Sequence, residues 1–485
     1  MKKLMRWFMA LALSLVAIGA VGAHSVYAAD DSLAKVKAKG TLVMGTSPDY
    51  APYEFLVNKN GKNQVVGIDV EIAKKIAADI GVKLEIKQMD FDSLLVALET
   101  HKVDMVLSAM TPTAERKQSV DFSQIYYTAS QDIIVNKADA KVYKNAESFV
   151  DKKVGAQTGS LQADLVKKNM TDSKLLGLSK VTDLILALKS HKVEGVVAEE
   201  PVAKAYVEND PQLALVKSGW ALDPEENGQA IGFTKGDDTL VAAANKSIAE
   251  IKQQHLIASY TKTAGQYMTE NTANTSMWHY WQYFAKGVGY TLLITAISVV
   301  FGLLLGTLFA LMRLGHNRLF HSLAVAYIEF VRGTPLMIQV MFVYFGIGLF
   351  VDIPALTAGI IAVALNSAAY VAEIIRSGID SIPVGQTEAA RSLGLSTRQT
   401  MTNVVLPQAV KNIWPALGNE FISLIKESSI VSIIGVTDLI YQLKVVQTAT
   451  YKGVAPIFVA MVIYFVLTFS LSKVLGHFER KMQHD

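Results

Sequence analysis

Arg116, in the stretch TPTAERK, is the side chain of this sequence best suited to hold a carboxylate. A guanidinium presents its N–H donors in one plane and can bind both carboxylate oxygens through charge-assisted hydrogen bonds. Thr111 begins the same stretch and adds a hydroxyl group. An arginine considered alone is more typical of a solvated helix surface, so the surrounding pattern has to decide between the two interpretations.

Two further stretches offer polar groups of the right kind. In QTGSLQADL, Thr158 and Ser160 present hydroxyl and backbone N–H groups at the expected start of a helix. A helix N-terminus favours an anion by about 0.3–1 kcal/mol, although TGS is also an ordinary helix cap. Glu199, in VVAEEPVA, follows a predicted strand and could pair with a cation.

The elements that position these residues occur twice in the sequence. LLVALETHKVDMVLSAMTP, residues 94–112, is repeated in outline by LILALKSHKVEGVVAEEP, residues 184–201. Each copy predicts an amphipathic helix, a charged HKV turn and a short strand. Because the loops after strands bind ligands in open α/β sheets, one copy in each of two lobes would place two such loops opposite one another. We therefore expect a two-lobed clamp with two strands crossing between the lobes.

Composition divides the 485-residue chain into a soluble half and a membrane half. Residues 30–270 mix charges with short apolar runs, whereas residues 285–480 contain several apolar runs long enough to cross a bilayer. The net charge of +3 and the lack of a basic run with interleaved aromatics argue against nucleic acid as a partner. Without cysteine, the sequence offers no disulfide, thiolate metal site or lipid-anchoring cysteine.

The N-terminal stretch, residues 1–28, has basic residues, then an apolar core, then small residues. This order predicts a secretion signal, with a retained transmembrane helix as the alternative. Either one would export the soluble half.

The membrane half predicts five spans, near 289–312, 322–349, 355–375, 413–435 and 454–475. The preceding stretch MWHYWQYFAKGVGY is rich in Trp and Tyr, which settle at the headgroup level. Positive charge after the first span, around 376–398 and in the tail places the soluble half outside and the C-terminus in the cytoplasm. The segment of about 262–276 has the composition of a flexible tether.

Several motifs of the soluble half, in order, resemble the solute-binding proteins of polar amino-acid ABC importers. They are SPDYAPYEF, VGIDVEIAKKIA, MDFDSLLVAL, MTPTAERKQSVDFSQIYY, QTGS and EEPVA, within residues 38–262. The resemblance implies an α/β periplasmic-binding-protein-like clamp of type II over residues 30–265. Lobe 1 would comprise about 30–126 and 222–262, and lobe 2 about 127–221.

The resemblance also implies a ligand site for a free amino acid. Arg116, Thr111 and the TGS loop would take its carboxylate, and Glu199, rather than its neighbour Glu200, its ammonium. Desolvating either charge without a partner would cost several kcal/mol. The implied ligand-binding residues are Ser47, Tyr50, Phe91, Ala109, Thr111, Arg116, Thr158, Ser160 and Glu199.

The ligand's side chain is less well defined by the resemblance. Tyr50 and Phe91 match aromatics that sandwich it in relatives, with core packing as the alternative. Ser47 stands where many relatives with basic or amide ligands have Asp, which weakens any claim about side-chain charge. Glutamine or a basic amino acid is favoured.

Residues 381–408, SIPVGQTEAARSLGLSTRQTMTNVVLPQ, are too polar to span a membrane and predict two short helices broken at Gly394. The stretch resembles the EAA loop of ABC permeases, which contacts the ATPase. The matching residues are Glu388, Ala389, Ala390, Gly394, Leu406 and Pro407. EFVRGTPLMIQV, ALNSAAYVAEIIRSGI and EFISLIKESSIVSIIG likewise resemble polar amino-acid permeases. An all-α transmembrane permease domain of about five helices is implied over residues 285–485, after a linker at 266–284.

These resemblances imply a fused binding-protein and permease subunit of an ATP-driven importer, and no enzyme. We expect no cofactor or metal on this chain. Because the sequence has no GxxxxGK[ST] loop, we expect ATP-Mg to bind to a separate cytoplasmic ATPase subunit. A homodimer through the permease domain, in a bacterial plasma membrane, is also implied. Arg332, Glu373, Lys426 and Glu427 lie near membrane depth and should pair or face the bundle.

Two other classes of function are open from the residues. An amino-acid-gated ion channel or receptor is suggested by GVGY at 287–290, which resembles a potassium filter, although no pore helix precedes it. An enzyme is suggested by His101 and His191, the paired histidines, although both occupy HKV turns that are typical of solvated surface.

Overall fold

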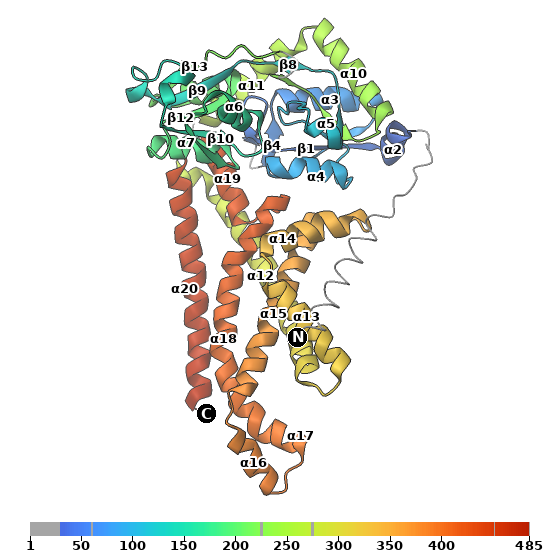
Figure 1. Cartoon of the computed structure of the whole chain (residues 1–485), viewed down its shortest axis with the longest axis vertical. Helices are drawn as coiled ribbons and strands as arrows, with labels where there is room; N and C mark the ends of the chain where they lie inside the picture. Colours follow the sequence, from blue (N-terminus) through green and yellow to red (C-terminus); the bar gives the residue numbers. More distant parts are fainter. Residues whose placement is uncertain (1–29, 60–61, 224–226, 273–275, 451, 485) are drawn as a thin grey trace.

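The computed structural model describes residues 30–484 except 60–61, 224–226, 273–275 and 451. The predicted secretion signal lies outside the described residues. Figure 1 shows an α/β part built from the first half of the chain, and long helices from the second half that extend away beneath it. The boundary between the two parts follows the change in composition.

Lobe 1 is built on a five-stranded sheet in the order β5-β1-β6-β15-β7. β1 is buried over nearly its whole length because it lies between parallel neighbours and helices cover the sheet. β15 returns from later in the chain and pairs in the antiparallel sense. The strands are Thr41–Thr46 (β1), Lys83–Gln88 (β5), Met105–Val106 (β6), Val120–Phe122 (β7) and Gly232–Thr234 (β15). The helices are Ser32–Lys39 (α2), Ile68–Ile80 (α3), Leu94–Glu99 (α4), Arg116–Ser119 (α5) and Asp238–Gln253 (α10).

A small antiparallel sheet, β2-β3-β4, is attached to lobe 1. Its strands are Asp49–Tyr50 (β2), Glu54–Lys59 (β3) and Lys62–Val66 (β4). The β2–β3 hairpin pairs Tyr50 with Glu54, so the motif SPDYAPYEF folds back on itself.

Lobe 2 repeats the plan with the sheet order β11-β10-β12-β9-β13. The strands are Gln131–Asn136 (β9), Lys153–Gln157 (β10), Lys174–Leu178 (β11), Gly195–Glu199 (β12) and Leu213–Lys217 (β13). The helices are Leu161–Asn169 (α6), Val181–Lys189 (α7) and Glu200–Asn209 (α8). Between the lobes, Tyr127–Thr128 (β8) and Gly228–Gln229 (β14) form a two-stranded antiparallel pair, where the sequence predicted two crossings.

The sequence repeat is also a structural repeat. α4 leads into β6 in lobe 1, and α7 leads into β12 in lobe 2. The histidine of each HKV turn adopts the same left-handed conformation, with φ 53° at His101 and 54° at His191. Both imidazoles are exposed, as expected for solvated turns.

The second half contains three helices long and apolar enough to cross a membrane among the described residues, or up to five if each of two bent pairs counts as one span. The helices are Trp281–Leu314 (α12), Ala355–Asp380 (α15) and Val454–His484 (α20). One bent pair joins Arg318–Arg332 (α13) to Leu336–Met341 (α14) and the turns after it at 108°. The other joins Thr397–Ile434, which contains Leu406–Glu427 (α18), to Leu439–Thr450 (α19) at 57°.

The predicted span near 322–349 is therefore broken. Pro335 stands just before α14, and a proline lacks an N–H and disfavours helical backbone in the residue before it. The segment predicted as a flexible tether also differs from expectation, because Leu256–Thr272 (α11) is helical over most of it.

Residues 381–408 form the two predicted short helices. Val384–Ser392 (α16) is followed by Gly394 with φ 86°, and Thr397–Thr400 (α17) leads through a π-helical turn into α18. Figure 1 shows α16 and α17 at the end of the helical part farthest from the α/β lobes.

Candidate functional site

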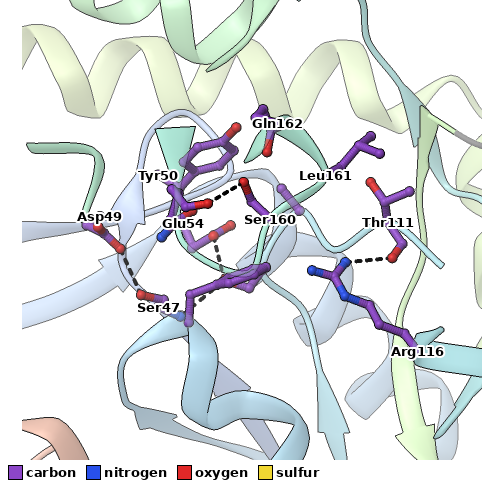
Figure 2. A pocket seen from close by; sticks show the side chains of 13 residues that line it. Ser47, Asp49, Tyr50, Glu54, Thr111, Arg116, Ser160, Leu161 and Gln162 are labelled. Atoms are coloured by element: carbon purple, nitrogen blue, oxygen red, sulfur yellow. Dashed lines mark hydrogen bonds between the residues drawn. The ribbon is translucent and has the colours of Figure 1, made fainter. Parts of the chain in front are cut away.

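A narrow pocket lies between the two lobes. Lobe 1 contributes the β2–β3 hairpin and the loops after β1, β5 and β6, and lobe 2 contributes the loop between β10 and α6. The lining residues are Ser47, Asp49, Tyr50, Glu54, Phe91, Ser108, Ala109, Thr111, Arg116, Gln157, Ser160, Leu161 and Gln162. In the view of Figure 2, Arg116 and Thr111 lie to one side, and Tyr50, Glu54 and Asp49 to the other.

Arg116 is the cationic group of this pocket. Its Nη1 donates to the Thr111 carbonyl at 2.7 Å, and its Nη2 reaches across to the Gly159 carbonyl of lobe 2, also at 2.7 Å. The guanidinium carbon lies 5.5 Å from the centre of the Phe91 ring, within cation–π range. Burial lowers the pKa of Arg116 to about 10, against the effect of Asp164 and Glu115, so the group stays charged at neutral pH.

Glu54 is one of the two acidic residues, with Asp49, that line the pocket. Its side chain is fully buried, and its Oε1 accepts a hydrogen bond of 2.8 Å from Ser108. Its Oε2 has no hydrogen-bond partner among the described residues. Burial, reinforced by the nearby charge of Asp69, raises the pKa of Glu54. The Glu54 and Asp69 carboxyl groups also share a hydrogen bond, so a proton on Glu54 stabilises the pair in the pocket without ligand, and a bound cation can replace that proton.

Asp69, at the start of α3, holds the loop that follows β6. Its carboxylate accepts hydrogen bonds from the Ala109 N–H at 2.8 Å and from the Tyr126 hydroxyl at 2.9 Å. Ala109 has a left-handed backbone with φ 44°, and this contact keeps it at the pocket wall. Burial raises the pKa of Asp69 to about 6, although these hydrogen bonds favour its charged form.

Of the two hydroxyl residues in the TGS loop, only Ser160 is among the residues that line the pocket. Ser160 lines the pocket and caps α6, because its Oγ accepts from the Ala163 N–H at 3.3 Å. Thr158 lies outside the lining residues: its N–H donates to the Leu178 carbonyl at 3.0 Å, and its hydroxyl lies beside Gly177 on β11.

Glu199, at the end of β12, is buried next to the pocket rather than in its lining. Its carboxylate accepts a hydrogen bond from the Gln229 side chain, and its backbone N–H donates to the Tyr50 hydroxyl at 3.4 Å. Burial raises the pKa of Glu199 to about 8, against the hydrogen bonds from Tyr53 and Gln229. Its neighbour Glu200 instead pairs with Lys204 at 2.9 Å and Lys217 at 3.0 Å.

Three charged residues of the site were missed in the sequence. Glu54 and Asp49 both lie in SPDYAPYEF, but nothing in the spacing shows that the hairpin turns them inward. Lys180, just before α7, reaches across the lobes to Asp49 at 3.4 Å and Asp90 at 3.1 Å. It also donates to Ser47 Oγ at 2.8 Å, so the serine is engaged by a lysine and by Asp49.

Both halves of the chain match known protein families. Residues 42–267 match the bacterial extracellular solute-binding proteins, family 3, and residues 298–484 match the binding-protein-dependent transport system inner membrane component. The first half is 39% identical over 219 residues to the arginine-binding extracellular protein ArtP of Bacillus subtilis, covering 44% of this chain and 82% of that protein.

The chain belongs to the amino-acid ABC transport families, as a solute-binding protein fused to its permease. The permease half is 42% identical to the arginine transport system permease protein ArtQ of Bacillus subtilis, covering 42% of this chain and 94% of that protein. It is 39% identical to the putative glutamine transport system permease protein GlnP of Rickettsia felis, covering 41% of this chain and 93% of that protein.

The lobes are also similar to a solved structure. The substrate-binding protein AbpA of Streptococcus pneumoniae, bound to L-arginine, is 38% identical, with 48% of this chain and 98% of that one covered and a TM-score of 0.46. The chain is a membrane-embedded transporter component and not an enzyme.

Within the permease half, Glu373 is held by arginines, which confirms the predicted pairing. It contacts Arg313 at 2.7 Å and Arg376 at 2.6 Å, and Arg332 lies at 3.9 Å. Lys426 and Glu427 are instead exposed on the surface of the single chain. The GVGY stretch lies inside the continuous helix α12, so it does not form the extended loop of an ion filter.

Proposed function

We propose that this chain captures a free amino acid with a cationic side chain, arginine or lysine, and passes it through its permease half in an ATP-driven importer. The observation that carries the proposal is that the lining of one pocket holds a cation, Arg116, and two buried carboxyl groups, Glu54 and Asp49.

Arg116 and Glu54 have opposite roles in this proposal. Arg116 takes the ligand's carboxylate in a bidentate pair, exchanging its two contacts to backbone carbonyls for ionic ones. Glu54 takes the side-chain cation through its unpartnered Oε2. Asp49, whose Oδ2 also has no hydrogen-bond partner among the described residues, adds negative charge at the same side of the pocket. Lys180 already pairs with Asp49, so a cationic side chain would mainly supply the counter-charge of Glu54.

The remaining contacts are assigned by position. Glu199 takes the ammonium, with Tyr50 and Phe91 packing on the aliphatic part of the ligand. Ser47, Ala109, Thr111, Thr158 and Ser160 complete the proposed ligand-binding set. Of these, Thr158 has to turn away from β11 to reach the ligand.

Glutamine is the second candidate ligand. Since burial raises the pKa of Glu54, a protonated Glu54 could donate a hydrogen bond to an amide oxygen. The relatives support both candidates, because they include an arginine-binding protein and a putative glutamine permease.

The proposed transport requires two partners, an ATPase and a second copy of this chain. The sequence has no phosphate-binding loop of the GxxxxGK[ST] type, so we propose that a separate cytoplasmic ATPase binds the loop at 381–408. Its exposed Glu388 and Ala389 lie at the end of the chain farthest from the clamp, which suits a partner on the opposite side of the membrane. A second copy would complete the path, with the clamp outside the cell and the C-terminus inside.

The Glu54→Gln variant tests the ligand's charge directly. We expect it to weaken L-arginine binding by at least about tenfold, because one desolvated ion pair is lost, and to bind the neutral isostere L-citrulline no more weakly than the wild type does. Calorimetry of the full chain in lipid nanodiscs measures both ligands. Glu200→Gln is the matched control and should leave both affinities unchanged. Unaltered arginine binding in Glu54→Gln would refute the cationic assignment.

A further inference from the structure

Glu54 and Asp69 are two acids buried beside each other at the ligand pocket. Both side chains are inaccessible to solvent, and Glu54 is the one that lines the pocket. Their carboxyl groups share a hydrogen bond, which requires a proton between them, because two carboxylates can only accept. Two buried carboxylates repel each other, so such a pair holds one proton more firmly than a lone acid does.

The contacts around the pair favour the proton on Glu54 rather than on Asp69. Asp69 Oδ2 accepts from the Ala109 N–H at 2.8 Å, and both of its oxygens lie 2.9 Å from the Tyr126 hydroxyl. Since a backbone N–H can only donate, these contacts stabilise the ionised form of Asp69. Glu54 instead accepts a single hydrogen bond from the described residues, that of Ser108.

Within Glu54, the proton and a ligand cation compete for the same atom. Ser108 Oγ accepts from the Ser47 N–H at 3.2 Å, so its own proton points to Glu54 Oε1, 2.8 Å away. Oε2 accepts no hydrogen bond from the described residues, which leaves it as the oxygen that carries the proton. Oε2 is also the atom proposed to take the side-chain cation of the ligand. The proton gives the pocket a neutral wall there, and its loss gives a negative one.

Other titratable groups surround Glu54. Asp49, in the neighbouring strand β2, adds negative charge and raises the pKa of Glu54 further. Tyr50 pairs with Glu54 in the hairpin, and Tyr126 is bonded to Asp69. Burial raises the pKa of both tyrosine hydroxyls, so they stay neutral at physiological pH. The proton exchanged near neutral pH therefore belongs to the two carboxyl groups.

The cations near the pocket are engaged with other partners. Lys180 lies 3.4 Å from Asp49 and 3.1 Å from Asp90. Arg116, opposite Glu54 in the view of Figure 2, donates to two backbone carbonyls and is the group proposed for the ligand's carboxylate. An ionised Glu54 therefore depends on the ligand for its counter-charge.

We propose that the proton shared by Glu54 and Asp69 sets which amino acids the clamp accepts, admitting uncharged side chains while it is present and cationic ones when it is lost. Arginine replaces the proton at Glu54 Oε2, and the proton leaves to solvent, whereas an uncharged amide binds without displacing it. Asp69 is a positioning residue, because it lies outside the pocket lining and acts through Glu54. The inference rests on the proposed function and deepens it, since pH then selects between the two candidate ligands.

The test compares L-arginine with L-citrulline, which has a neutral ureido group in place of the guanidinium. Calorimetry of the full chain in nanodiscs measures both affinities from about pH 5 to about pH 9. Both ligands carry the same α-ammonium, so the protonation of Glu199 cancels in the ratio of their affinities. An acid with a raised pKa has to lose its proton before it pairs with a cation. We therefore expect the arginine-to-citrulline ratio to rise with pH, by up to about tenfold per pH unit, and then to level off.

Variants of the two acids separate this role from a structural one. Glu54→Gln removes the titrating group, so its ratio should be low and independent of pH. Asp69→Asn removes the negative neighbour that raises the pKa of Glu54, so the rise should persist but move to lower pH. Glu71→Gln is the matched control and should follow the wild type, because Glu71 lies on the same helix α3 and pairs with Lys74 at the surface.

Infrared spectroscopy detects the proton without any ligand. The wild type should show a carboxyl C=O band at neutral pH that Glu54→Gln lacks, and identical bands in the two would contradict the shared proton. A wild-type ratio that does not change with pH, or a ratio that still rises in Glu54→Gln, would overturn the proposal. If neither ligand bound at any pH, the proposed function would fail and the selectivity with it, although the infrared band would still report the proton.

Discussion

Glu199 is the residue whose protonation should link amino-acid binding to pH. Burial raises its pKa to about 8, so in the clamp without ligand it is largely protonated at neutral pH. An ammonium needs the ionised carboxylate and lowers the pKa of Glu199 when it binds. Binding below pH 8 therefore releases a proton.

We predict that affinity for L-arginine rises with pH between 6 and 8, by at most about tenfold per pH unit for one proton. The sign follows from the direction of the shift: an acid with a raised pKa in the free clamp must lose its proton before it can pair. Calorimetry in buffers of different ionisation enthalpy counts the proton released. Because Glu54 also has a raised pKa and can lose a proton of its own when a cation binds, Glu199→Gln should release about one proton fewer than the wild type. Equal proton release from the two would contradict the assignment of Glu199 to the ammonium.

At the scale of residues, the sequence could predict those that lie in ordered motifs. Arg116 and Thr111 line the pocket together, as do Tyr50 and Phe91. Glu54 could not be foreseen, because its role depends on a hairpin that turns one of several acids into the interior. Whether each predicted residue binds the amino acid stays a prediction.

Among the elements, α12 and α15 pack against each other through small residues. A Cβ on Gly306 would lie 2.6 Å from Val371 Cγ1, and one on Gly302 would lie 2.8 Å from the Ser367 hydroxyl oxygen. Small residues let membrane helices pack closely where apolar burial gives no driving force.

Gly306→Val should therefore destabilise the permease half by about 1–3 kcal/mol through overpacking. Thermal unfolding in detergent, compared with Gly289→Val on the same helix, measures the loss. Within the described part of the chain, no atom lies within 4 Å of a Cβ placed on Gly289, apart from those of its chain neighbours and the helix backbone, so that variant should unfold like the wild type. Equal midpoints for the two variants would show that the helices do not pack through Gly306.

Residues 381–408 form the element proposed to bind the ATPase. Glu388 is exposed on α16, so reversing its charge should leave the fold and the amino-acid affinity intact. We predict that Glu388→Lys abolishes ATP-dependent uptake in proteoliposomes containing the ATPase while retaining wild-type ligand binding. Uptake at the wild-type rate would exclude a coupling role for this residue.

The sequence predicted helices, strands and breaks correctly where its hydrophobic periodicity is regular. The repeated helix and strand, the two crossings and the break at Gly394 all follow from local signals. The bend between α13 and α14 was missed because an apolar run around Pro335 has the composition of one span. The helical tether was missed because Thr, Asn and Gly are weak helix formers that contacts elsewhere can override.

On the scale of the whole molecule, the chain joins an amino-acid-binding clamp to the helices of a permease. Covalent fusion keeps the clamp at high effective concentration over the permease, so capture need not wait for a diffusing partner. Lys102 and Lys444 then tie the docked clamp to two separate parts of the helical half.

The most direct test of this account is a thermal-shift titration of the full chain in nanodiscs against all twenty amino acids. The account predicts stabilisation by L-arginine or L-lysine above all others, abolished in Arg116→Ala and weakened in Arg116→Lys, which keeps the charge without the planar fork. No stabilisation by any amino acid, or a response that persists in Arg116→Ala, would contradict it.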